Sequence, residues 1–324
     1  MPTFIAARRT HSARRRPLLL ELRKPLRCLI SCLLWLPCFQ LPHLSYVGKP
    51  MAQVRPHGER QLRTTMFVRE RRGSLWRKNS NSKAPVVASG GKKAAKILTS
   101  RINKAPTATE LLNVLNEAVD FPDFNYFHIS TAYHTLAMFH RNGLLQGLCE
   151  SPVLPKLHTR TKTIMMSQQI NPQASANVLW AMAVIVDTIP GTTQLLPALI
   201  KVFPEKAAGM DEQELANCLW ASAQLKDVAP DMLKVVPALG SQIPGKAVDM
   251  NAQELSNCLW ASARLKDVAP DAVRVVPPLV AHIPGKAGQM IEKGLSQCRL
   301  ALEELKDVAP EVLKIEPAIR ARTP

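Results

Sequence analysis

The chain has 324 residues and a formal net charge of +17, because 42 Lys and Arg residues outnumber 25 Asp and Glu residues. Residues 1–100 carry 21 of the basic residues and only three acidic ones, a net charge of 21 − 3 = +18. The other 324 − 100 = 224 residues hold 42 − 21 = 21 basic and 25 − 3 = 22 acidic residues, a net charge of 21 − 22 = −1. The net charge of these residues therefore gives no argument that they bind nucleic acid. The length allows one or two domains.

Residues 1–90 have the composition of a basic targeting leader followed by a flexible linker, and we expect most of them to be disordered. The leader begins with arginine-rich sequence and continues with an apolar run over residues 28–39. A run of this length suits the core of a signal peptide better than a membrane span, which needs about 20 residues. We therefore predict a cleaved leader, with no stable membrane insertion after cleavage. A retained anchor over residues 28–47 and a start at Met51 are the alternatives.

Residues 94–168 are predicted to form a divergent N-terminal helical repeat. Thr107 and Glu110 make a capping-box pattern that opens a helix with an apolar stripe, and Pro122 ends that helix. A second helix is predicted over residues 125–140, which carry apolar residues on one side. We expect these two helices to form the first unit of an array, because terminal repeats diverge where one face meets solvent.

Residues 171–324 repeat one pattern with a constant step of 40 residues. One position of the repeat holds Trp180, Trp220, Trp260 and Leu300, where 220 − 180 = 260 − 220 = 300 − 260 = 40. A second position with the same step holds Asn177, Asn217, Asn257 and Gln297. A unit of this length cannot bury its apolar face alone and stacks on its neighbours. We predict four tandem helical-hairpin repeats, the last one degenerate. The predicted fold is all-α, a right-handed α-solenoid of about four to five two-helix repeats after a disordered basic leader.

Each repeat is predicted to contain a helix A and a helix B. Asp211 with Glu214 begins helix A with an N-cap and a carboxylate three residues later, and residues 251–254 repeat this arrangement. Helix B is predicted to begin at Pro230 and to stop at Pro244 and Gly245. Pro237 falls inside helix B and predicts a kink there. Residues 211–250 and 251–290 are identical at 27 of 40 positions, and most differences are small or polar.

The sequence offers no catalytic constellation. It contains no phosphate-binding loop, no paired-carboxylate site and no arrangement of nucleophile and base. It also has no CxxC pair and no pair of histidines with zinc spacing, so we expect no metal site. Cys218, Cys258 and Cys298 share one repeat position and are predicted to be small, buried apolar side chains. We therefore predict a protein that is not an enzyme and carries no cofactor.

Two segments carry a family resemblance. Residues 215–225 (LANCLWASAQL) and 255–265 (LSNCLWASARL) resemble the helix A signature of octotricopeptide-type repeats. They are also similar to the helical repeats of FAST-kinase-like and RAP-domain organelle proteins and of helical subunits of the RNA-editing substrate-binding complex. The resemblance covers about residues 94–324 and implies a protein, imported by a transit peptide into a plastid or mitochondrion, that binds single-stranded organellar RNA. It further implies a role in transcript processing, stability or editing with protein partners in a ribonucleoprotein complex.

The chain differs from that group in ending at Pro324 without a RAP domain, so we do not expect it to cleave RNA. With about four to five units, its footprint on RNA would be short if each unit reads one nucleotide. The alternative function is a HEAT- or armadillo-like scaffold for protein–protein interaction without direct RNA contact. The balanced charge of the repeats favours this alternative.

The candidate RNA-binding residues fall into two groups. One repeat position holds Val184, Gln224, Arg264 and Glu304 in turn, which is the variation that a specificity position or an unconstrained surface position would show. Gln213 shares a helical face with Gln224. Two basic ladders could follow a phosphate backbone and consist of Lys206, Lys246 and Lys286, and of Lys234, Arg274 and Lys314. Acidic residues nearby also fit a self-neutralised, solvated helix face.

The residues that reveal the repeat are predicted to be its structural core. They are Asn177, Trp180, Asn217, Trp220, Asn257 and Trp260. The tryptophans could stack on bases, but their apolar neighbours in every unit favour packing between repeats. The asparagines are interpreted as buried amides that bond to a neighbouring loop.

Overall fold

The structure is a computed structural model that describes residues 91–322, and these residues contain helices and no strand. The predictions for the leader and for most of the linker concern residues 1–90, which lie outside the described part. The α-helices are α2 (Gly91–Asn103), α3 (Ala108–Ala118), α4 (Tyr126–Arg141), α5 (Val153–Met166), α6 (Pro172–Ile185), α7 (Leu196–Lys206), α8 (Glu212–Leu225), α9 (Val236–Lys246), α10 (Ala252–Leu265), α11 (Pro270–Val273), α12 (Val276–Lys286), α13 (Glu292–Leu305) and α14 (Glu316–Arg320). The 3₁₀ helices are η1 (Thr192–Leu195), η2 (Ala207–Gly209), η3 (Pro230–Val235), η4 (Ala287–Gln289) and η5 (Pro310–Ile315). The prediction of an all-α fold is confirmed for residues 91–322.

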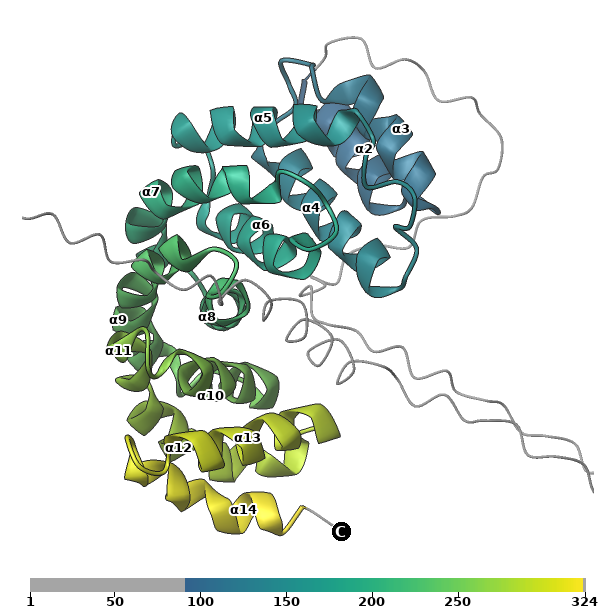
Figure 1. The fold of residues 1–324 in the computed structure, drawn as a ribbon. Helices are drawn as coiled ribbons and strands as arrows, with labels where there is room; N and C mark the ends of the chain where they lie inside the picture. Colours follow the sequence, from purple (N-terminus) through teal and green to yellow (C-terminus); the bar gives the residue numbers. More distant parts are fainter. Residues whose placement is uncertain (1–90, 323–324) are drawn as a thin grey trace, which may run out of the picture. The chain divides into compact units, whose positions relative to one another are not determined.

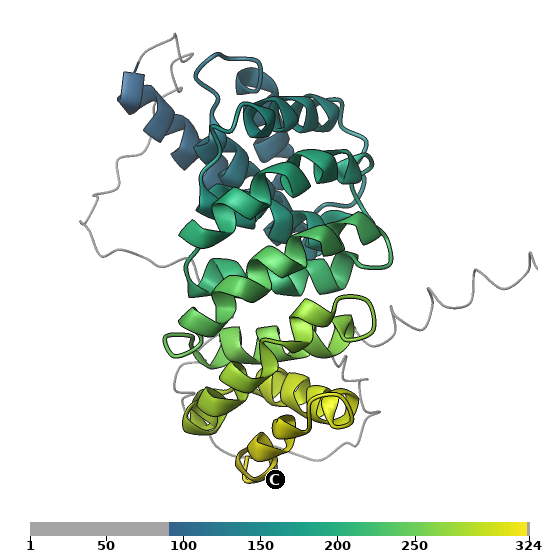
Figure 2. The same cartoon turned by 90° about the vertical axis from the view of Figure 1, so that its left-hand side faces the viewer.

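The helices of the unit Ser80–Pro324 stack in two rows. In the inner row α4, α6, α8, α10 and α13 pack in that order, each on the next. In the outer row α5 packs on α7, α7 on η3, α9 on α11, and α12 on η5. The stack bends so that the inner row lines the inside of the bend (Figure 1), and the outer row covers the opposite side (Figure 2). The repeat in the sequence is therefore a repeat in the architecture.

The predicted start of helix A is confirmed in the two most similar repeats. At α8 the Glu214 amide donates to Asp211 Oδ1 over 2.9 Å, and the Asp211 amide donates to Glu214 Oε2 over 3.1 Å. Asn251 and Glu254 form the same reciprocal box at α10, with bonds of 3.0 and 2.8 Å. These bonds satisfy backbone donors that the first helical turn leaves without intrahelical partners, so both helices start where the local sequence dictates.

Helix B differs from the prediction in its first half. Residues from Pro230 to Val235 form the 3₁₀ helix η3, and α9 begins only at Val236. Pro237 therefore lies in the first turn of α9, where a missing N–H costs no intrahelical bond, and the predicted interior kink is instead a junction between two helix types. Pro244 lies inside α9, and the helix continues to Lys246.

The N-terminal block is divided differently from the prediction. The predicted N-cap of α3 is confirmed, since the Glu110 amide donates to Thr107 Oγ1 over 3.1 Å. However, the helices predicted as one unit, α3 and α4, belong to different pairs. Because α4 packs on α6 and α5 packs on α7, the hairpin in register with the later repeats is α4 with α5. In the same way α2 packs on α4 and α3 on α5.

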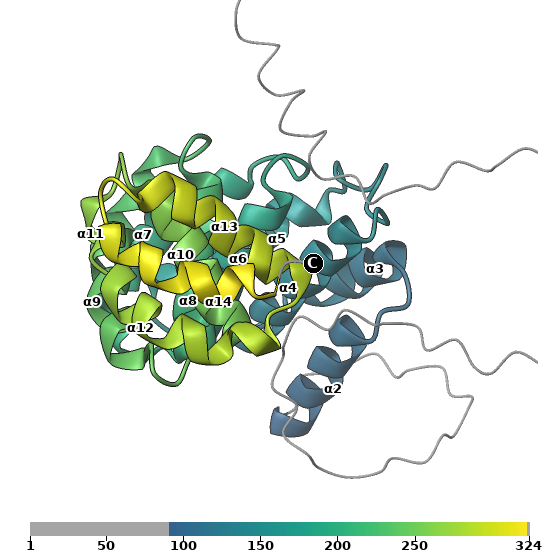
Figure 3. The ribbon, with the colours of Figure 1, turned by 90° about the horizontal axis from the view of Figure 1, so that it is seen from below.

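The last repeat carries charged residues at positions where earlier repeats pack on a neighbour, and its helices α13 and α14 lie at the end of the stack that faces the viewer in Figure 3. Leu259 and Ala263 of α10 are buried, and their counterparts on α13 are Arg299 and Glu303. Arg299 forms an ion pair with Glu292, and Glu303 binds Lys306 over 3.0 Å. Charged residues at packing positions are expected of a terminal repeat that meets solvent, which gives the degeneracy of this unit a physical reason.

The core lies between the rows, where apolar side chains from both helices of each unit are buried. Cys218, Cys258 and Cys298 are fully buried, as predicted, and burial raises the pKa of the Cys298 thiol to about 12. None of the helices within residues 91–322 is both long enough and apolar enough to span a membrane.

Candidate binding surface on the inner row

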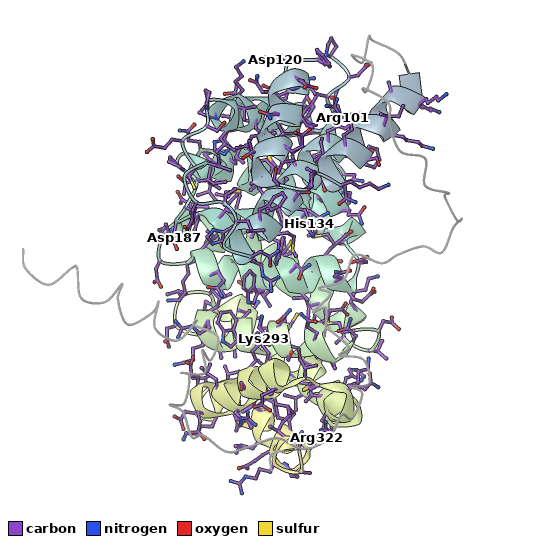
Figure 4. All side chains as sticks on the ribbon, turned by 90° about the vertical axis from the view of Figure 1, so that its right-hand side faces the viewer. Arg101, Asp120, His134, Asp187, Lys293 and Arg322 are labelled. Atoms are coloured by element: carbon purple, nitrogen blue, oxygen red, sulfur yellow. The ribbon has the colours of Figure 1, made fainter. Side chains whose placement is uncertain are left out.

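Four positions of helix A in each repeat lie on one side of the helix and define a surface that we call the inner face. They are Gln173, Asn177, Trp180 and Val184 on α6; Gln213, Asn217, Trp220 and Gln224 on α8; Gln253, Asn257, Trp260 and Arg264 on α10; and Lys293, Gln297, Leu300 and Glu304 on α13. Their spacings of four, three and four residues keep them on one side of each helix. Figure 4 views the stack from this side, with His134 of α4 and Lys293 near its middle. The inner face thus combines amides, indoles and a variable position in a regular grid.

Amide side chains at the two ends of the grid are hydrogen-bonded within the protein. Asn177 Nδ2 donates to Ser130 Oγ over 3.0 Å, and Gln297 Nε2 donates to Asn257 Oδ1 over 3.1 Å. Ser256 Oγ also donates to Gln297 Oε1 over 3.3 Å. The partners of Asn177 and Gln297 lie on the adjacent helix of the inner row, not on a neighbouring loop as the sequence suggested. The amides therefore connect one repeat to the next.

Three amides at the centre of the grid, Asn217, Gln224 and Gln253, have no such side-chain partners among the described residues. The side chains of Asn217, Gln224 and Gln253 are half-buried, and none makes a hydrogen bond within residues 91–322. Each carries a carbonyl acceptor and two N–H donors. The centre of the inner face therefore offers hydrogen-bonding groups to a ligand without first breaking a bond inside the protein.

The rings of the inner face form two contacting pairs. His134 stacks on Trp180, with ring centroids 5.5 Å apart and planes 29° apart. Trp220 and Trp260 lie 6.5 Å apart at 33°. Trp180 is buried with 7% of its surface exposed, whereas Trp220 and Trp260 are half-buried. The indoles lie between neighbouring repeats, as a core role requires, and the central pair also contributes to the surface.

The variable position is occupied by groups that interact with each other in the last two repeats. Arg264 Nη1 lies 3.6 Å from Glu304 Oε1, and the two side chains are 42% and 29% exposed. This distance is longer than the 2.7–2.9 Å typical of a charge-assisted hydrogen bond, so the pair is loose. Gln224 in the preceding repeat has no partner within residues 91–322. Adjacent copies of this position therefore differ both in chemistry and in availability.

The two basic ladders lie on the outer row, and three of their six side chains form ion pairs. Lys246 pairs with Glu212 at 3.1 Å, and Lys286 donates to the carbonyl oxygens of Val248 and Met250. In the second ladder, Lys234 forms an ion pair with Asp231 at 2.6 Å, and Arg274 forms one with Asp271 at 2.8 Å. Only Lys206 and Lys314 lack a partner among the residues described. The structure does not bring these ladders to the inner face, and they do not form a continuous phosphate-binding track.

The sequence did not lead us to two cationic side chains of the inner row, Arg141 at the end of α4 and Lys293 at the start of α13. Burial lowers the pKa of Lys293, and the charge of Arg141 lowers it further. Burial also lowers the pKa of His134, again with a contribution from Arg141. The end of α4 and the start of α13 therefore bring positive charge to the same side of the stack. Repeat alignment could have identified Lys293, which occupies the position of Gln213 and Gln253, but Arg141 lies outside the 40-residue repeat.

Residues 91–322 contain no group of three or more His, Cys, Asp and Glu side chains that could hold a metal ion. Comparison of the chain with protein-family models, curated proteins and solved structures found no match.

Proposed function

We propose that this protein binds single-stranded RNA along the inner face of an open, right-handed α-solenoid. The observation that carries the proposal is the group of three amides without internal partners, Asn217, Gln224 and Gln253, beside the half-buried Trp220–Trp260 pair. Amides hydrogen-bond to the edges of unpaired bases, and indoles stack on base faces. Both types of group are therefore suited to a single strand and poorly suited to a small apolar ligand.

Charge on the inner row supports the same ligand class. Arg141 and Lys293 bring positive charge to the inside of the bend, where a phosphate backbone would reduce their mutual repulsion. Neutralising phosphates is the main source of affinity for nucleic acids. The proposed strand thus meets cations on α4 and α13 and base-binding groups on α8 and α10.

The biological setting of the proposal comes from the sequence resemblance. A leader of targeting character and helix A segments similar to octotricopeptide-type repeats favour an organelle, a plastid or a mitochondrion, as the site of action. We propose that the protein acts on transcript processing, stability or editing within a larger ribonucleoprotein complex and contributes no catalytic step itself.

The first test is direct binding by the full chain. A fluorescently labelled single-stranded RNA should bind, and Trp220→Leu with Trp260→Leu should weaken binding at least about fivefold, because stacking on an aromatic ring contributes about 1–3 kcal/mol per base. Leucine already occupies this repeat position at Leu300, so the variants keep an apolar side chain that the fold accepts. Gln242→His is a matched control, because His282 occupies the equivalent position of the next repeat on the outer row.

Equal RNA affinity of the wild-type protein and the double Trp variant would contradict the proposed use of the inner face. In cells, crosslinking the tagged protein and sequencing the bound RNA should recover specific organellar transcripts. Recovery at background level would overturn the RNA proposal itself.

A scaffold for protein partners is the second candidate, and the ion pairs on the outer row favour it. The ladder side chains Lys234, Lys246 and Arg274 are engaged in ion pairs and offer little free charge to a polyanion. This function would be supported if one protein co-purified with the tagged chain in stoichiometric amount while RNA stayed at background.

A further inference from the structure

The variable position of the inner face differs between two nearly identical repeats. Residues 211–250 and 251–290 share 27 of 40 residues, yet this position changes from Gln224 to Arg264. Each residue follows the tryptophan of its own repeat by four positions, one helical turn along the same face. The pair therefore places two different polar groups at the same position of successive repeats, each beside a half-buried indole.

The chemistry of these two side chains distinguishes purines. A glutamine amide offers one donor and one acceptor, which match N7 and the N6 amino group of adenine. An arginine guanidinium offers two parallel donors, which match O6 and N7 of guanine. On this N7 edge of the purine, exchanging the two side chains would place acceptor against acceptor at guanine O6 or donor against donor at the adenine N6 amino group. The two positions thus have opposite base preferences.

Both side chains are available to a ligand. The Gln224 amide makes no hydrogen bond within residues 91–322 and is half-buried, so little freedom is lost when it binds. Arg264 lies 3.6 Å from Glu304 through Nη1 and is 42% exposed, which leaves its other donors free to meet a base. The flanking copies contribute less, because Val184 has no hydrogen-bonding group and Glu304 faces Arg264.

We propose that α8 and α10 form a two-position base-reading site, in which Gln224 selects adenine and Arg264 selects guanine. The proposal rests on the proposed binding of RNA along the inner face. It names the sequence class of the ligand as a single strand that presents one adenine and one guanine to adjacent repeats. The exposed parts of Trp220 and Trp260 lie beside these two bases.

The test compares four RNAs with the full chain, each a short uridine strand with AG, GA, AA or GG at its centre. The wild-type protein should prefer AG or GA over both AA and GG by at least about fivefold, the lower end for a bidentate base contact. Because the basic leader attracts any phosphate backbone equally, the ratio of affinities is the readout rather than the affinity itself.

Exchanging Gln224 and Arg264 between the two repeats provides the variants for a second test. Gln224→Arg should shift the preference to GG, and Arg264→Gln should shift it to AA, since each variant copies the residue of the neighbouring repeat. The double exchange should restore a preference for one A and one G with their order reversed. Gln242→His, which lies on the outer row, should leave all four ratios unchanged. Far-UV circular dichroism checks that each variant keeps its helices, and the wild-type ratios test the proposal even if one variant does not fold.

The outcomes separate this inference from the proposed function. Binding of all four RNAs with equal affinity would overturn the two-position site and leave RNA binding intact. Ratios that do not change in either single variant would also overturn it. Failure to bind any of the RNAs above the level of a duplex control would overturn both proposals.

Discussion

His158 makes the stability of the protein depend on pH in a way that can be calculated. The side chain lies on α5, is only 4% exposed, and stacks on Tyr133 with ring centroids 6.1 Å apart. Its Nε2 atom is buried without a hydrogen-bond partner in the described part of the chain. Protonation would place a charge there with nothing to stabilise it, so burial lowers the pKa of His158 from its ordinary 6.5 to about 4.

The direction of the effect follows from which state binds the proton. Between pH 6.5 and pH 4 the unfolded chain binds a proton at His158 and the folded chain does not, so the free energy of unfolding falls as the pH falls. The contribution is fully present above pH 6.5 and is lost by pH 4. A difference of 6.5 − 4 = 2.5 pKa units corresponds to about 3 kcal/mol.

Urea unfolding followed by circular dichroism at pH 7.5 and pH 4.5 measures this effect. His158→Phe keeps an aromatic ring against Tyr133 and removes the titrating group, so the variant should lose about 2–3 kcal/mol less than wild type on acidification. Glu214, whose pKa burial raises to about 7, contributes with the opposite sign as the pH falls. Its contribution is common to both proteins and cancels in the comparison. Parallel pH dependences of wild type and variant would refute the assignment to His158.

Four further predictions concern the outer-row helix α9 and the inner-row helices α8 and α13, and urea unfolding measures each. Gly240→Ala should destabilise the protein by about 1–3 kcal/mol, because the added Cβ would lie 3.0 Å from the Asp271 carbonyl oxygen. Gly245→Ala on the same helix meets no atom within 4 Å and should stabilise by about 0.5–1 kcal/mol; equal effects at both glycines would contradict the close approach. Asp211→Ala should cost about 1 kcal/mol through loss of the α8 cap, and an unchanged midpoint would show that the cap is dispensable. Ile291→Asp should stabilise by about 1 kcal/mol, because the α13 N-cap has extended backbone geometry and no side-chain bond; a destabilised variant would count against this.

The features that the sequence predicted well depend on residues close together in the chain. The capping boxes at Asp211 and Asn251 and the N-cap at Thr107 involve partners three residues away, so local pattern suffices. The division of helix B into η3 and α9 was not predicted, because a proline such as Pro237 fits either a kinked helix or the first turn of a new one. The same division recurs in the last repeat, where η5 is followed by α14.

The repeat pattern did not predict which residues of the candidate site contact each other. Asn217 and Asn257 occupy the same repeat position in nearly identical segments. Only the side chain of Asn257 has a hydrogen-bond partner among the described residues, and that partner is Gln297 on the following helix. The pairing of Arg264 with Glu304 likewise depends on residues 40 positions apart, as 304 − 264 = 40. A repeat pattern identifies equivalent positions, but the neighbours on adjacent repeats determine which of them are free.

The distribution of paired and unpaired amides locates the surface most suited to a ligand. Ser130 of α4 binds Asn177, and Gln297 of α13 binds Asn257, so both of these inner-face amides are used in holding repeats together. Between them, Asn217, Gln224 and Gln253 remain available on α8 and α10, where Trp220 and Trp260 are also half-buried. The exposed part of a half-buried amide can bond to water, and a ligand can replace that water without breaking a hydrogen bond inside the protein. Ligand specificity should therefore arise at α8 and α10, whereas substitutions at Asn177 or Gln297 should act mainly through the stability of the stack.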